Sequence, residues 1–265
     1  MNAQEESQQL LWGRTKDLLL PDGKTVTIRE QNGNDDDILS NTSKAKDLTN
    51  QSDFIRGIVV KADWTASGRL SLDDIDKMLI KNKYFILFAS RIHSIGEIVK
   101  FAYDWGKSNG GEISYEDDLS KYLWDFSEPI PEKGEDDYFE FRMQPYVAKA
   151  NELQYFATSS GKELRYRCLN ICDERELMKL DREAITKNRE LIQRDLELKD
   201  KDGKWVKIHN FMWFNKRDMT EIHKEVNHTD SAFMPITEIE NPREDVPNIM
   251  YPIIASSSFF FPEEI

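Results

Sequence analysis

The sequence has few of the features that mark secreted or membrane-spanning proteins. Only two cysteines, Cys168 and Cys172, occur among 265 residues, and two thiols so close together cannot form the disulfide framework of a secreted domain. We therefore expect both to be reduced, small core residues. The longest apolar runs, at residues 84–89 and 259–261, fall far short of the roughly 20 residues that cross a bilayer. The N-terminus is polar and acidic, so no signal peptide is expected.

Signatures of catalysis and of metal binding are also missing from the sequence. It has no Gly-rich phosphate loop, no Gly-x-Ser-x-Gly elbow and no His-Glu-x-x-His motif. The spacing of the two cysteines fits no strong zinc pattern. Leu198 and His209 stand where a calcium loop around Lys199–Lys204 would need oxygen ligands, so that segment is interpreted as a turn. We predict no enzyme, no cofactor and no metal site.

The sequence has fewer positively than negatively charged residues, 36 Lys and Arg against 49 Asp and Glu. The formal net charge is −13 and the isoelectric point is near 4.9, whereas nucleic-acid binding draws most of its affinity from Lys and Arg on phosphates. We therefore expect no nucleic-acid partner, no membrane span and no small-molecule substrate. The sequence instead predicts a chain made in the cytoplasm that acts through contacts with other proteins.

Large apolar side chains are plentiful, since the chain has 14 Phe, 9 Tyr and 6 Trp. Their burial can offset chain entropy, which predicts a folded protein. Leu18–Glu30 has a Pro-Asp-Gly-Lys turn followed by alternating apolar residues and is expected to be a hairpin. A helix capped by Asn or Asp should follow, and further helices, one capped by Ser71, are expected up to Trp105. The prolines, glycines and short aromatic alternations after Trp105 indicate a small β-rich insertion or linker.

Two segments of the chain align without a gap, which indicates an internal repeat. Residues 22–39 read DGKTVTIREQNGNDDDIL, and residues 160–177 read SGKELRYRCLNICDEREL. Gly-Lys turns and acidic helix starts are common, so chance matches are the alternative. A true duplication would place two related faces on one adaptor, and the two copies could pack about a pseudo-twofold axis. The identical pairs are Gly23 and Gly161, Lys24 and Lys162, Arg29 and Arg167, Asn32 and Asn170, Asp35 and Asp173, and Leu39 and Leu177.

Three stretches resemble the baseplate hub and tail-assembly proteins of contractile-tailed (myovirus-type) bacteriophages. They are LPDGKTVTIREQNGNDDDIL at residues 20–39, FILFASRIHSIGE at residues 85–97, and the terminal Phe triplet after an apolar strand. Relatives often carry Cys-x-x-Cys ribbons after the central helix and near the C-terminus, but Tyr103–Asp125 and Asn241–Phe261 contain no Cys. The resemblance implies ribbon-like strands without zinc, and a role in building the hub at the tail tip with no reaction catalysed.

The sequence as a whole predicts an α+β protein with two related strand-plus-helix units and a β-rich insertion between them. The expected parts are a tail at 1–17, a first unit at 18–105, the insertion at 106–150 and a second unit at 151–265 that ends in an apolar strand. We predict a structural component of the phage baseplate, located in the virion and bound to other tail proteins. Self-association in a symmetric assembly is a further option. An assembly chaperone absent from the particle and an acidic inhibitor of a host protein are the alternatives. The predicted contact residues are Phe259, Phe260 and Phe261, together with Tyr122, Trp124 and Phe126 of the insertion. The Phe triplet is expected either to insert into a neighbouring subunit or to dock on the core of its own chain.

Overall fold

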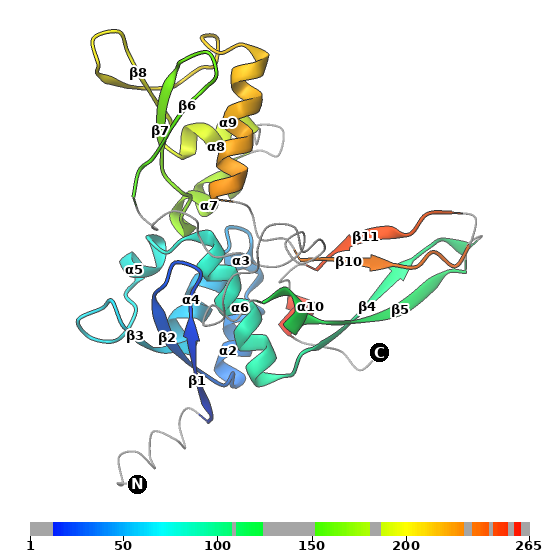
Figure 1. Ribbon diagram of the computed structural model, residues 1–265. Helices are drawn as coiled ribbons and strands as arrows, with labels where there is room; N and C mark the ends of the chain where they lie inside the picture. Colours follow the sequence, from blue (N-terminus) through cyan, green and yellow to red (C-terminus); the bar gives the residue numbers. More distant parts are fainter. Residues whose placement is uncertain are drawn as a thin grey trace.

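The computed structural model contains helices together with several antiparallel sheets, so the prediction of an α+β fold is confirmed. Figure 1 shows a lower body with strands β1 to β3, a second body above it with strands β6 to β8, and an arm of strands at one side. The structure describes residues 13–107, 110–123, 152–180, 187–230, 235–243, 246–253 and 257–260.

The first body is a three-stranded antiparallel sheet covered by helices. The sheet order is β1 (Thr15–Leu19), β2 (Thr25–Arg29), β3 (Val59–Ala62). The helices are α2 (Gly33–Leu39), α3 (Thr42–Ala45), α4 (Thr49–Ile58), α5 (Leu72–Asp76) and α6 (Ile80–Ser94).

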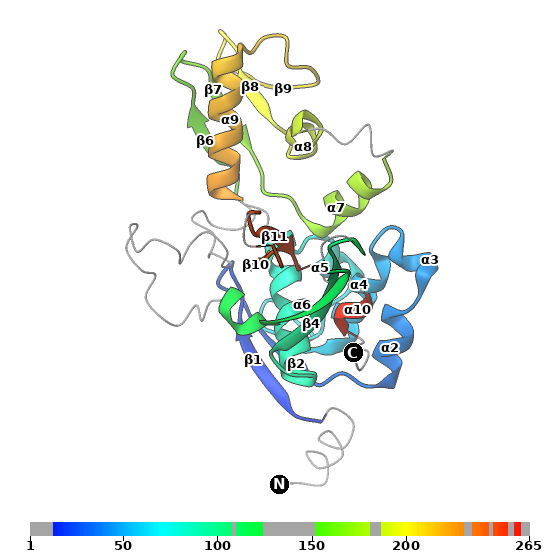
Figure 2. The ribbon, with the colours of Figure 1, turned by 90° about the vertical axis from the view of Figure 1, so that its right-hand side faces the viewer.

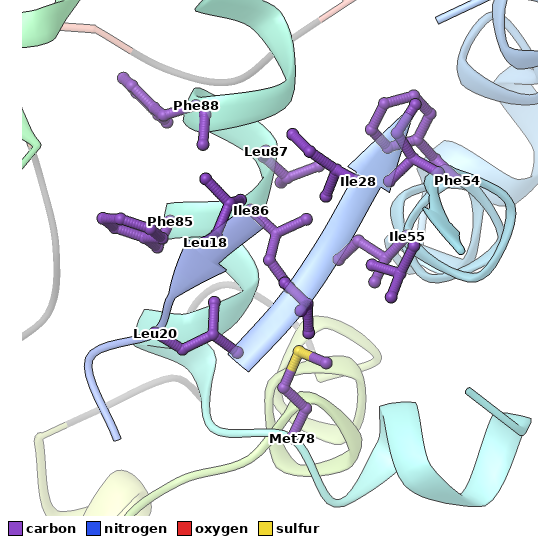
Figure 3. Packing of buried hydrophobic residues seen from close by; sticks show 14 of the residues in the cluster. Leu18, Leu20, Ile28, Phe54, Ile55, Met78, Phe85, Ile86, Leu87 and Phe88 are labelled. Carbon is purple, nitrogen blue, oxygen red and sulfur yellow. The ribbon is translucent and has the colours of Figure 1, made fainter. Parts of the chain in front are cut away.

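Alternation along the first hairpin explains its core face. Leu18 on β1 and Val26 and Ile28 on β2 are buried, and they share the core with Phe54 of α4 and Ile86 of α6 (Figure 3). The predicted hairpin and the predicted caps are both present. The side chain of Asn32 caps α2, and that of Ser71 caps α5.

The second body is a four-stranded antiparallel sheet with one long helix along it. The sheet order is β6 (Gln154–Ala157), β7 (Glu163–Tyr166), β8 (Glu197–Lys199), β9 (Trp205–Lys207). Its helices are α7 (Ile171–Met178), α8 (Lys187–Gln193) and α9 (Lys216–Thr229). Figures 1 and 2 both show α9 beside β6 and β7, and Ile222 and Val226 of α9 share a separate core with Leu164 and Tyr166 of β7. The predicted turn at Lys199–Lys204 is present, between β8 and β9.

The arm consists of two hairpins that come from distant parts of the sequence. One is β4 (Ile98–Asp104) with β5 (Glu112–Asp118), and the other is β10 (Ile236–Ile239) with β11 (Ile249–Pro252). A short 3-10 helix, η2 (Leu119–Tyr122), follows the first hairpin, and α10 (Ser257–Phe260) follows the second.

The prediction of helices up to Trp105 is wrong at two places, because β3 occupies Val59–Ala62 and β4 occupies Ile98–Asp104. The chain turns at Gly96, whose φ of 120° suits glycine alone, and α6 ends just before it. Ile98, Val99, Phe101 and Tyr103 then favour an extended strand, since β-branched and aromatic residues fit a pleated sheet. β4 lies in the predicted first unit and β5 in the predicted insertion, so one hairpin crosses that predicted boundary.

Aromatic rings pack the two hairpins of the arm against each other. Phe101 of β4 stacks on Tyr251 of β11 with ring centroids 4.8 Å apart and planes 1° from parallel. Tyr103 meets the same tyrosine edge-on at 5.8 Å. Trp105 donates a hydrogen bond to the hydroxyl of Tyr115 at 2.7 Å, and that hydroxyl donates to the carbonyl of Glu240 at 3.0 Å. Ring contacts and hydrogen bonds thus hold the two hairpins together.

The two bodies share a local arrangement around an arginine. Arg29 forms two hydrogen bonds with the carboxylate of Asp35, at 2.6 and 2.7 Å, and donates to the carbonyl of Gly57 near the end of α4. Arg167 forms the same paired contact with Asp173 and donates to the carbonyl of Gln193 at the end of α8. In each body, one arginine thus joins a strand, the first turn of one helix and the end of another.

The order of elements also agrees between the two bodies. A hairpin, a helix capped by Asn, a helix leading into the third strand, a long helix and an arm hairpin follow one another twice along the chain. Each arm hairpin ends in a short helical turn. The first body differs by two extra short helices, α3 and α5, and the second body by an extra strand, β9.

Candidate interaction surfaces

Two of the terminal phenylalanines predicted as contact residues pack within the chain, which was the alternative to insertion into a neighbour. Phe259 and Phe260 are each 3% exposed and belong to the core of the first body. Their rings lie 4.8 Å from Phe88 and 5.4 Å from Phe54, between centroids. The prediction that these two side chains offer an exposed contact surface is therefore wrong, because the first body already buries them. Phe261 lies outside the described residues.

Of the aromatic contact residues predicted in the insertion, the one that the structure describes is buried. Tyr122 is buried, and its hydroxyl is bonded to the carboxylate of Asp117 and to the carbonyl of Ile236. Burial raises the pKa of the Tyr122 hydroxyl, with the Asp117 carboxylate adding to the effect. Tyr122 thus joins the first arm hairpin to the second. Trp124 and Phe126 lie outside the described residues.

A buried ion pair joins the two bodies. Lys83 of α6 is fully buried, and its Nζ lies 2.5 Å from a carboxylate oxygen of Glu174 on α7. The hydroxyl of Tyr84 donates to the other oxygen of Glu174 at 2.9 Å. Burial lowers the pKa of Lys83, and the nearby Glu174 opposes that shift. A charge placed there is stable only while its partner stays in position, so the pair fixes α7 against α6.

Backbone hydrogen bonds reinforce this junction. The amide of Ile171 donates to the carbonyl of Met78 at 2.9 Å, and the amide of Ile80 donates to that of Leu169 at 3.3 Å. Ile171 also enters the core of the first body. Figure 1 shows α7 at this boundary, between the two bodies. The junction is thus a continuous part of the fold.

The two thiols and the acidic side chains form no recognisable metal site among the described residues. No three His, Cys, Asp or Glu side chains gather there in a way that could hold an ion. Cys168 is buried, and burial raises the pKa of its thiol to about 12. Its neutral thiol packs as a small apolar group, as predicted for it.

One surface turn presents large apolar side chains to solvent. Met212 is 89% exposed and Trp213 is 56% exposed, in the loop between β9 and α9. Lys216 and Arg217 begin α9 beside them and are exposed. We call Met212, Trp213, Lys216 and Arg217 the turn patch.

A second surface combines apolar and acidic side chains on the arm. Met250 of β11 is 48% exposed and lies directly across from Glu238 of β10. Glu240, the residue just after β10, is also exposed. We call Glu238, Glu240 and Met250 the strand patch.

The sequence contained a signal for the turn patch that the aromatic count alone did not reveal. Phe211, Met212, Trp213 and Phe214 are four consecutive large apolar residues immediately before Asn215, a helix cap with its partner acid three positions later. A turn that leads into a capped helix can bury only some of four adjacent side chains. This run of four residues therefore indicates that at least one large apolar side chain faces solvent.

Comparisons with known proteins identify no relative. No protein-family model, no curated protein and no solved structure matches the chain. Among the described residues, none of the helices combines the length and the apolar character needed to cross a bilayer.

Proposed function

We propose that this chain is a structural, protein-binding component of the baseplate of a contractile-tailed bacteriophage. The observation that carries the building-block role is the recurrence of one arrangement in both bodies, from the Gly-Lys hairpin through the Arg–Asp contact to the arm hairpin. We infer that the chain is an internal duplication. The phage assignment is supported by the sequence resemblance at residues 20–39, 85–97 and 259–261.

The joined architecture suits a scaffold. Each body has its own apolar core, and the junction between them is held by Lys83, Glu174 and two backbone hydrogen bonds. Two related bodies held in a fixed relation can offer related surfaces to two neighbours at once. Exposed apolar side chains on one body and on the arm supply candidate contacts of the kind that dominate interface energy.

Quantitative mass spectrometry of purified phage particles tests this proposal. We expect the chain at a fixed, low copy number relative to a known tail protein. Its absence from particles, combined with abundance in infected cells, would reject the structural role and favour the assembly chaperone or the host-protein inhibitor.

A further inference from the structure

We propose that the turn patch of one copy of this protein docks on the strand patch of a second copy. The inference builds on the proposed role as a repeating building block. It assigns Met212, Trp213, Lys216 and Arg217 on one side of the contact, and Glu238, Glu240 and Met250 on the other.

The turn patch is rigid before it binds. The amide of Phe214 donates to the carbonyl of Phe211 at 3.1 Å, which closes a four-residue turn. Phe214 is buried and Phe211 is half-buried against the same core, so both ends of the turn are fixed. Met212 and Trp213 occupy the tip, where Gly, Asn, Asp, Pro and Ser are usual. Because the backbone of the turn is already fixed, its ordering adds little to the entropy lost on binding.

The charges of the turn patch point to an anionic partner. Lys216 and Arg217 lie in the first turn of α9, at the positive end of the helix dipole, where cations are unfavourable. Arg217 pairs with Glu221 at 3.1 Å, and Lys216 forms no ion pair with any described residue. Residues 199–217 contain six Lys or Arg and two Asp, a local excess of four positive charges in a chain of net charge −13.

The strand patch has the complementary character. Glu238 and Glu240 form no ion pair within the described part of the chain, and the exposed Met250 lies directly across the hairpin from Glu238. Residues 236–252 contain four acids and a single Arg. Apolar contacts at the centre of such an interface, with opposite charges around them, would supply both affinity and orientation. The same chain therefore carries both halves of a complementary surface.

The two patches cannot meet within one chain. The turn patch lies at the start of α9, and β10 begins seven residues after α9 ends. A helix of 14 residues is about 21 Å long, and Figure 1 shows the arm beyond the far end of α9. The contact must therefore join different copies. Because each copy would use a different patch, the contact is heterologous and builds a ring or an open chain.

A charge-swap experiment on the full-length protein tests this docking. Sedimentation analysis of the wild type should show concentration-dependent association that weakens as salt rises from about 50 mM to about 500 mM. The K216E/R217E variant alone and the E238K/E240K variant alone should each lose association at least about tenfold. Mixing the two variants should restore it, because each then supplies the partner that the other lacks. The M212S/W213S variant should also lose association about tenfold or more.

Matched controls separate docking from general charge and folding effects. The K46E/K224E variant makes the same charge change at exposed positions outside both patches and should associate like the wild type. Circular dichroism should show that every variant keeps its fold. A wild type that stays monomeric up to about 100 µM, where even a contact of μM affinity would show, overturns the proposal. So does a mixture of the two swapped variants that fails to associate.

Two further results distinguish this inference from others. Binding of the wild type to vesicles of phosphatidylcholine and phosphatidylserine, lost in M212S/W213S, would assign the turn patch to a membrane surface and reject docking. A monomeric protein that is present in purified particles would reject docking and keep the baseplate role. If the two charge-swapped variants associate when mixed but the protein is absent from particles, docking is supported and the baseplate role is rejected.

Discussion

At the scale of single residues, the Arg–Asp contacts explain why two distant segments fold alike. Arg29 and Arg167 each lie at or just after the end of a strand, and each reaches an Asp in the first turn of the next helix. The Asp also completes a capping box with Asn32 or Asn170. One carboxylate thus pairs with the arginine and also accepts the backbone hydrogen bond of the Asn cap at the start of the helix. A matched sequence pattern therefore has a common physical cause in both bodies.

Removing the buried arginine should strongly destabilise the first body. In Arg29→Ala the Asp35 carboxylate would stay buried without its cation, so we expect a loss of about 3–5 kcal/mol in the free energy of unfolding, measured by urea titration. Arg14→Ala is the matched control, because its ion pair with Glu30 is solvent-exposed and should cost less than about 1 kcal/mol. Equal effects of the two substitutions would contradict this account.

Asp218 links the β6–β7 turn to α9 and should make stability depend on pH. Lys162 and Ser160 each donate to its carboxylate at 2.7 Å and hold its pKa at about 2, below the ordinary value of 3.8. A lowered pKa means that the ionised carboxylate stabilises the folded state above about pH 4, and that this contribution is lost as pH falls toward 2. The stabilisation is therefore an acid-sensitive property of the second body.

The substitution Asp218→Asn should lower the melting temperature at pH 6. The difference from the wild type should shrink steadily as pH falls below 4, since the wild type then loses the same ionised group. Asp202→Asn, at an exposed position of the β8–β9 turn, provides the control and should melt like the wild type throughout. A difference for Asp218→Asn that stays constant down to pH 3 would contradict the assigned role of this carboxylate.

At the scale of elements, one turn geometry occurs in three hairpins. Gly23, Gly161 and Gly203 have φ values of 83°, 84° and 78°. In each turn the glycine amide donates to a carbonyl three residues earlier, at 2.8 to 3.0 Å. The residue after each glycine is Lys, whose carbonyl accepts the next hydrogen bond of the turn. The left-handed backbone, and not the space around it, makes glycine necessary, because an added Cβ would meet no atom within 4 Å.

Replacing a turn glycine should therefore destabilise the fold only because other residues disfavour a positive φ, and not through a steric clash. We expect Gly161→Ala to lower the free energy of unfolding by about 1–2 kcal/mol, measured by urea denaturation. Gly33→Ala is the matched control: its surroundings are equally open, but it begins α2 with an ordinary φ. That substitution should be neutral or stabilise by up to about 1 kcal/mol. A destabilisation by Gly33→Ala as large as that by Gly161→Ala would refute the argument from φ.

At the scale of the whole molecule, the C-terminal end of the chain completes the core of its first body. Phe259 and Phe260 pack against Phe88 and Phe54, and Arg91 donates to the carbonyl of Phe259 at 3.2 Å. Residues more than 160 positions apart thereby share one apolar cluster. The packing thus crosses the predicted division into successive units, since α10 of the predicted second unit belongs to the core of the first body.

Truncating one of these rings should destabilise the first body. We expect Phe260→Ala to cost about 3–5 kcal/mol through lost apolar burial and the cavity left behind, measured by thermal and urea unfolding. Met212→Ala, which removes an exposed apolar side chain of the turn patch, should change stability by less than about 0.5 kcal/mol. A small effect for Phe260→Ala would show that the terminal helix does not dock.

Local chemistry could be predicted from the sequence because its causes lie within a few residues. The alternation at Thr25–Arg29, the glycine turn before it and the acids at the start of α2 predicted the first hairpin and its capped helix. The matched segment at 160–177 pointed to a second hairpin of the same kind. The α+β class followed from these patterns, and so did the turn at Lys199–Lys204.

Only the tertiary structure decided which apolar residues would be covered. Phe259, Phe260 and Tyr122 were candidate contact residues in the sequence, yet they are buried, while Met212 and Trp213 stay exposed between their buried neighbours. The strand at Ile98–Asp104 likewise depends on its partners Glu112–Asp118 and on rings from β11. Sequence determines local preference, whereas burial depends on residues far along the chain that happen to meet, and no local pattern contains that information.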